Sequence, residues 1–152
     1  MKLADTARRG RQLEAIAEAL PQRASELSQL FLTRSSVCVS RTEVGVLRRL
    51  AAGSRRITEL AIDEHVTQPA MTLLVNRLVE RGWVLRAPDP DDGRAVRVSL
   101  TPAGEDALER LRAEYRAMLH QEMATLDDGQ VHTLACAVEI LDQLIGGLTD
   151  RP

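Results

Sequence analysis

The segment VLRAPDPDDGRAVRVSL, residues 84–100, interrupts a chain whose apolar residues otherwise recur at helical spacing. Short apolar stretches at 84–85 and 95–100 flank an acidic turn that contains proline and glycine. Extended stretches separated by Pro, Asp and Gly are typical of two strands joined by a turn. The segment therefore predicts one small β-hairpin in a mainly α-helical protein.

The tip of this hairpin carries Arg94 directly after an acidic cluster. A neighbouring carboxylate can orient a guanidinium through a charge-assisted hydrogen bond, and Asp92 is the expected partner. Gly93 allows the tip to turn sharply. An arginine oriented in this way could enter the minor groove of DNA, where the electrostatic potential is most negative. The alternative is a solvated turn without a partner.

Helix caps precede the hairpin. Ser40 and Glu43 form the capping box SRTE, which opens a helix to about residue 52. Thr58 is expected to cap the next helix, with Ile57 and Ile62 as a hydrophobic staple. These signals predict two helices in quick succession.

A third helix follows after a brief turn, capped by Thr67 and ending at Gly82. Two helices joined by a tight turn form a helix-turn-helix, whose second helix meets base edges in the major groove with its N-terminal half. The candidate contact residues are Thr67, Gln68, Pro69, Ala70, Thr72, Leu73 and Asn76. Gln and Asn can pair with adenine, and the methyl groups of Ala and Thr suit thymine. Followed by a hairpin, the motif is a winged helix.

Long helices are predicted on both sides. Residues 1–34 form two helices, 5–19 and 21–34, or one helix kinked at Pro21. Thr101 opens a helix to about residue 125, and Asp127 with Gln130 caps the last one. That helix has a coiled-coil-like seam of Val131, Leu134, Val138, Leu141, Ile145 and Leu148. We expect the seam to pack between subunits; the alternative is packing within one subunit.

Charge is distributed unevenly along the 152 residues. The net charge is +2 over residues 1–40, +2 over 41–100 and −6 over 101–152, which allows a cationic face in the first two thirds. No stretch approaches the ~20 apolar residues of a membrane span. Without a secretory signal or a disulfide framework, a cytoplasmic location and no membrane contact are expected.

Residues 57–104 resemble the MarR family of bacterial transcription regulators. The resemblance rests on the Leu60–Ala61 pair, the NRLVERGWV helix end, the D-G-R hairpin tip and the LTPAG start of the next helix. It implies a homodimeric repressor that binds a pseudopalindromic operator and is released by a small apolar or phenolic ligand, or by oxidation. It also implies DNA contacts by Arg77, by Arg86 near phosphate and by Arg94, with Asp92 orienting Arg94.

The resemblance also implies an organisation. Residues 1–34 would be N-terminal dimerisation helices, 35–100 the winged helix-turn-helix region, and 101–152 C-terminal dimerisation helices, in one compact domain overall. Two positions depart from the family pattern. Leu73 stands where family members often carry Arg, which removes one contact or changes the sequence read. His65 stands where Gly often makes the turn, although His tolerates a left-handed backbone.

Other functions find less support in the residues. No nucleophile pair or phosphate loop indicates an enzyme, and scattered His residues predict neither a metal site nor a cofactor. Cys38, near Arg34 and Arg41, is a candidate redox-sensitive thiol, with an inert buried cysteine as the alternative. A winged helix used only as a protein–protein adaptor is the main rival to DNA binding.

Overall fold

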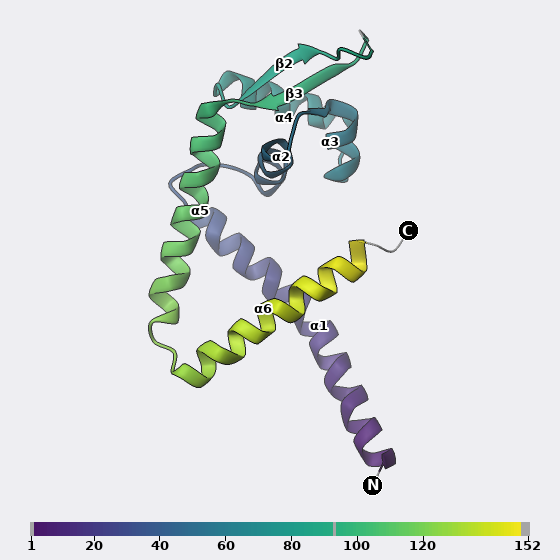
Figure 1. Cartoon of the computed structure of the whole chain (residues 1–152), viewed down its shortest axis with the longest axis vertical. Coiled ribbons are helices and arrows are strands. Elements are labelled where there is room, and N and C mark those ends of the chain that lie inside the picture. Colours follow the sequence, from purple (N-terminus) through teal and green to yellow (C-terminus); the bar gives the residue numbers. More distant parts are fainter. Residues whose placement is uncertain (1, 93, 150–152) are drawn as a thin grey trace. The chain divides into compact units, whose positions relative to one another are not determined.

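The computed structural model describes residues 2–92 and 94–149 and shows a mainly helical chain with one small antiparallel sheet (Figure 1). The predicted winged helix-turn-helix between long helices is confirmed. Two compact units, residues 1–112 and 113–152, divide the chain. The elements are α1 (Lys2–Arg34), α2 (Arg41–Ala51), β1 (Arg55–Arg56), α3 (Ile57–Asp63), α4 (Gln68–Glu80), β2 (Val84–Pro88), β3 (Val96–Leu100), α5 (Pro102–Met123) and α6 (Asp128–Thr149).

Two helices begin at the capping boxes that the sequence predicts. The Ser40 hydroxyl accepts from the backbone N–H of Glu43 at 3.2 Å, and the Glu43 carboxylate accepts from that of Ser40 at 2.7 Å. Asp127 and Gln130 make the same reciprocal pair at 2.8 and 3.1 Å before α6. Each box satisfies backbone donors that a helix N-terminus leaves unpaired. The helices therefore start where local chemistry favours them.

The start of α3 differs from the prediction. Arg56, rather than Thr58, precedes the helix, and its backbone N–H donates to the Glu59 carboxylate at 2.7 Å. Ile62 is 74% exposed, so the predicted staple with the buried Ile57 is wrong. The cause is a tertiary contact: Arg55 and Arg56 form β1, which pairs with β3, and α3 begins directly after β1.

The N-terminal region is one helix, so its interpretation as two separate helices is wrong. Pro21 lies inside α1, which runs from Lys2 to Arg34. A proline removes one backbone hydrogen bond from a helix interior. The surrounding Glu, Ala, Leu, Gln and Arg residues favour helix, and the helix continues on both sides of the proline.

The sheet has the strand order β1-β3-β2, with antiparallel pairing throughout. β2 and β3 form the predicted hairpin, in register from Val84 opposite Leu100 to Pro88 opposite Val96. β1 was not predicted from the sequence. It adds only two residues, with Arg55 opposite Val98 and Arg56 opposite Arg97, yet it joins the wing to the start of the helix-turn-helix.

The core lies within the winged helix, between its helices and its sheet, and is built almost entirely from aliphatic side chains. Val46 and Leu47 of α2, Leu60 of α3, and Val98 of β3 are nearly inaccessible to solvent. The inner face of α4 joins them with Met71, Leu74, Val75 and Leu78. Because these four alternate with outward residues at helical spacing, the opposite face of α4 is left for a partner.

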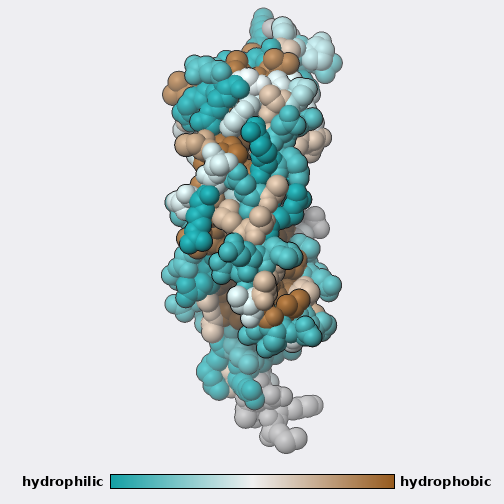
Figure 2. Space-filling model, turned by 90° about the vertical axis from the view of Figure 1, so that its left-hand side faces the viewer, coloured by the Kyte–Doolittle hydropathy of each residue, from teal (hydrophilic) through white to brown (hydrophobic). Residues whose placement is uncertain are grey.

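α6 contrasts with the winged helix because none of its described residues is buried. Seam residues Val131, Leu134, Val138, Ile145 and Leu148 are all more than 40% exposed, as are Leu13 and Ile16 of α1. Contrary to the sequence-based expectation, α6 is long and apolar enough, by length and composition alone, to cross a membrane. Figure 2 shows one face of the molecule, on which hydrophobic residues lie among hydrophilic ones.

Candidate nucleic-acid interface

Helix α4 presents the predicted contact residues on its exposed side. The Thr67 hydroxyl caps the helix by accepting from the Ala70 N–H at 3.4 Å. Thr67, Gln68, Pro69, Ala70, Leu73 and Arg77 are exposed, and Thr72 and Asn76 are half-buried. The helix ends at Glu80, and Gly82 follows with a positive φ of 73°, which lets the Trp83 N–H return to the Leu78 carbonyl at 3.0 Å.

The turn before α4 has the left-handed residue that the sequence anticipates. His65 has a φ of 53°, and it is the one described non-glycine residue with a positive φ. An ion pair holds the turn against α2: Arg49 Nε donates to the Glu64 carboxylate at 2.7 Å and another guanidinium nitrogen to the Asp63 carbonyl at 3.0 Å. A Cβ on Gly45 would overlap the Glu64 carboxylate, so a glycine makes room for this clamp.

Three outward side chains of α4 already have partners within the chain. The Thr72 hydroxyl donates to the Gln68 carbonyl at 2.9 Å. The Asn76 side-chain oxygen accepts from the Arg86 guanidinium, which links α4 to β2. Arg77 Nε lies 3.6 Å from the carboxylate of the buried Glu43. A base or phosphate that engaged Asn76 or Arg77 fully would therefore compete with an internal partner.

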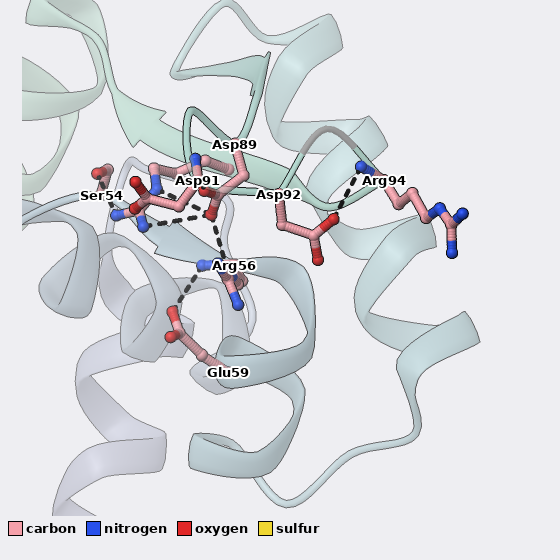
Figure 3. A network of polar contacts seen from close by, with 8 residues as sticks. Ser54, Arg56, Glu59, Asp89, Asp91, Asp92 and Arg94 are labelled. Carbon is pink, nitrogen blue, oxygen red and sulfur yellow. Dashed lines mark hydrogen bonds and ion pairs between the residues drawn. The ribbon is translucent and has the colours of Figure 1, made fainter.

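Asp89, and not the predicted Asp92, is the acid that binds arginine side chains in the wing (Figure 3). The Asp89 carboxylate is fully buried and accepts from Arg56 Nε at 2.7 Å; it also lies 3.2 Å from a guanidinium nitrogen of Arg97. Its other oxygen accepts from the Asp91 N–H at 2.9 Å. One carboxylate thus joins β1 and β3 to the wing turn.

Hydrogen bonding keeps the Asp89 carboxylate ionised. The bond from Arg56 is the largest cause that holds the pKa of Asp89 well below its ordinary value, and the backbone N–H of Asp91 adds to it. The same contact raises the pKa of Arg56. The presence of Asp89 in the acidic cluster is therefore explained, because it is the internal counter-ion for two arginines.

Asp92 does not orient the Arg94 side chain as predicted. Its carboxylate accepts from the backbone N–H of Arg94 at 3.1 Å, and the guanidinium points away from the acidic cluster (Figure 3). A short side chain that bonds to the backbone two residues later is the usual stabiliser of such a turn. Within the described residues, the Arg94 guanidinium makes no ion pair and is exposed. The expected role of Gly93 concerns a position outside the described residues.

A groove of about 370 Å³ lies between α4 and the wing. Gln68 and Thr72 come from α4, Arg86 and Arg94 from the wing, and Arg56 from β1, directly before α3. Arg56 is already paired with Asp89, and Asp92 also lines this groove. Within the described residues Arg86 and Arg94 make no ion pair, so these two arginines beside an exposed helix favour an anionic partner. Arg56 was missed by sequence reasoning, because a two-residue strand gives no periodic signal.

A second hollow, of about 430 Å³, lies beside Cys38. Cys38 is exposed, which contradicts the buried alternative, and its carbonyl accepts from Arg81 at 2.8 Å. The Arg81 guanidinium stacks 4.9 Å from the centre of the Trp83 ring, and Arg110 lines the same hollow. Arg81 and Arg110 therefore line the hollow beside this cysteine, whereas Arg34 and Arg41, the neighbours named from the sequence, do not line it. The described residues include no group of side chains arranged to hold a metal ion.

Comparisons with known proteins agree with this architecture. The MarR family model matches residues 39–96. An uncharacterized HTH-type transcriptional regulator of Mycobacterium bovis is 33% identical over 118 residues, which are 77% of this chain and 82% of that protein. A mutant MarR from Escherichia coli is 27% identical with a TM-score of 0.72, over 83% of this chain and 95% of that one.

A further structure holds nucleic acid: mutant MarR from Escherichia coli in complex with operator DNA. It is 26% identical, with a TM-score of 0.61, over 86% of this chain and 95% of that one. The fold, the family match and the relatives lead to one assignment. This chain belongs to the MarR family and is a winged helix-turn-helix transcriptional regulator.

Proposed function

We propose that this regulator is a cytoplasmic repressor that binds a pseudopalindromic operator as a homodimer and has no catalytic role. The observation that carries the proposal is the exposed N-terminal half of α4 beside a groove that Arg86 and Arg94 line. This arrangement fits a helix in the major groove with a cationic wing next to it. The structural relative bound to operator DNA supports the same reading.

The residues divide by expected role. The major-groove set is Thr67, Gln68, Pro69, Ala70, Thr72, Leu73, Asn76 and Arg77. Arg94 would enter the minor groove, because it is exposed and directed away from the acidic cluster. Arg86 would contact phosphate at the base of the wing, and Asp92 would act indirectly by bonding the Arg94 backbone.

Dimerisation is supported by the apolar side chains left exposed on α1 and α6. Leu13 and Ile16 on α1, and Ile140 and Ile145 on α6, are all more than half exposed. A two-fold dimer would remove such surfaces from water and present two winged helices. Half-sites about one helical turn apart, roughly 10 bp, are then expected. Dimerisation would also cover the apolar side chains of α6 with protein, so we propose that α6 does not contact a membrane.

Release from DNA is proposed to follow binding of a small apolar or phenolic effector, or oxidation. The hollow beside Cys38 offers an aromatic ring and two guanidinium groups, which suit an aromatic compound with an acidic group. The exposed thiol in the same hollow is the candidate for oxidation.

The test is selection of genomic DNA fragments by the purified protein, followed by salt titration of the recovered site. A shared inverted repeat is expected, with affinity that falls steeply as salt rises, because phosphate contacts release counter-ions. Arg94→Ala should reduce the salt slope by about one if that arginine neutralises one phosphate. Arg23→Ala, which removes an exposed arginine from α1, is the matched control. Failure to recover any fragment at low salt would favour the protein–protein adaptor.

A further inference from the structure

The outward face of α4 carries an apolar strip in the middle of its polar residues. Pro69, Ala70 and Leu73 are all exposed, and Leu73 follows Ala70 by three residues and Pro69 by four, which places it beside both on the helix surface. Leu73 is 63% exposed. It does not belong to the core, because Leu74 and Val75 already fill the buried side of this turn.

The surroundings of the strip indicate what covers it. Gln68 and Thr72 border it and line the groove that also contains Arg86 and Arg94. Arg77 lies one turn beyond Leu73 on the same helix. An apolar protein or lipid surface would bring no negative charge to these cations, whereas nucleic acid brings phosphates on both sides of a groove. The charge pattern therefore favours DNA over an apolar protein or lipid surface.

Within the major groove, thymine presents its 5-methyl group for apolar contact, while the other base edges present mostly donors and acceptors. A leucine and an alanine at the centre of the helix surface cannot form hydrogen bonds through their side chains. We propose that Leu73, together with Ala70 and Pro69, recognises thymine methyl groups and so determines part of the operator sequence. This inference rests on the proposed DNA-binding function and assigns specificity within it.

The experiment removes only the methyl group. Each thymine of one half-site is replaced in turn by deoxyuridine, which keeps all Watson–Crick donors and acceptors, and the Kd is measured by fluorescence anisotropy. Burial of one methyl-sized group contributes about 0.8 kcal/mol, which corresponds to a loss of about fourfold in affinity per contacted thymine. We expect this loss at one or two thymines in the half-site.

A variant of Leu73 tests whether this side chain makes the methyl contact. Leu73→Ala should bind with nearly equal affinity whether thymine or uracil occupies the position that Leu73 contacts. Its salt slope should match that of the wild type, because no charge is removed. Leu85→Ala is the control: Leu85 is 60% exposed, and its side chain lies on the opposite face of β2 from that of the groove-lining Arg86. That variant should keep the wild-type sensitivity to the methyl group.

The outcomes separate this inference from the broader proposal. Tight binding to a shared operator that is indifferent to uracil at every position would overturn the methyl contact and leave DNA binding intact. A Leu73→Ala protein that keeps the full methyl effect, or that loses dimerisation instead, would also overturn it. Absence of any DNA binding by the wild type would remove both proposals together.

Discussion

Replacement of Gly45 by alanine tests the clamp between α2 and the helix-turn-helix turn. Alanine stabilises a helix interior by roughly 1 kcal/mol relative to glycine. The new Cβ would overlap the Glu64 carboxylate, which is the end of a flexible side chain and can move aside at the cost of its bond to Arg49. The Glu64 side chain is 15% exposed and that of Arg49 41% exposed, so solvent screens the pair. Its loss should cost about 1 kcal/mol.

The two effects should nearly cancel in the wild-type background. Gly45→Ala is expected to change the free energy of unfolding by less than about 0.5 kcal/mol, while the same change in a Glu64→Ala background should stabilise by about 1 kcal/mol. Urea denaturation of the four proteins at neutral pH measures the coupling. Equal stabilisation in both backgrounds would refute the reasoning, because it would mean that the Glu64 carboxylate does not occupy the space beside Gly45.

Two further predictions concern the wing and its base. Gly104→Ala should destabilise the fold by about 1–3 kcal/mol, because the added Cβ would overlap the backbone carbonyl of Trp83, which cannot swing away; thermal unfolding measures this, with Gly10→Ala in open space as the control. Since the folded pKa of Asp89 lies below its ordinary value of 3.8, the stabilisation it provides is present above about pH 4 and is lost as the pH falls further. Asp89→Asn should therefore lower stability at neutral pH and flatten the acid limb of the stability curve; an unchanged acid limb would contradict the network.

Local chemistry explains which parts of the fold were predictable. The capping boxes at Ser40 and Asp127 act over three residues, so their helices begin where the sequence indicates. The outward face of α4 also followed from periodicity, because the buried positions recur every three or four residues. The hairpin was recognisable from its turn residues. The DNA contacts assigned to these positions stay predictions.

What could not be predicted depends on contacts between distant residues. Arg56 and Asp89 are 33 positions apart, and their pairing becomes visible only when β1 lies against β3. Sequence reasoning gave the orienting role to Asp92 because that residue is nearest to Arg94 along the chain. In the structure Asp89 is the acid that binds arginines, and these are Arg56 and Arg97 rather than Arg94. Asp89 is inaccessible to solvent, and a buried carboxylate requires a charged or hydrogen-bonded partner. A contact between distant residues also explains why Arg56, and not Thr58, precedes α3: Arg55 and Arg56 pair with β3, and the helix begins directly after them.

The partners that Asn76 and Arg77 hold within the chain have a consequence for discrimination between DNA sites. Asn76 would have to release its hydrogen bond from Arg86, and Arg77 its ion pair with Glu43, before a nucleotide could engage either side chain fully. A well-matched nucleotide replaces that bond with one of similar strength, whereas a poorly placed one leaves it intact and gains little. If Asn76 and Arg77 contact the operator as proposed, the internal contacts should lower the affinity for mismatched sequences more than that for the operator. Weaker binding to arbitrary DNA would then accompany greater selectivity for the operator.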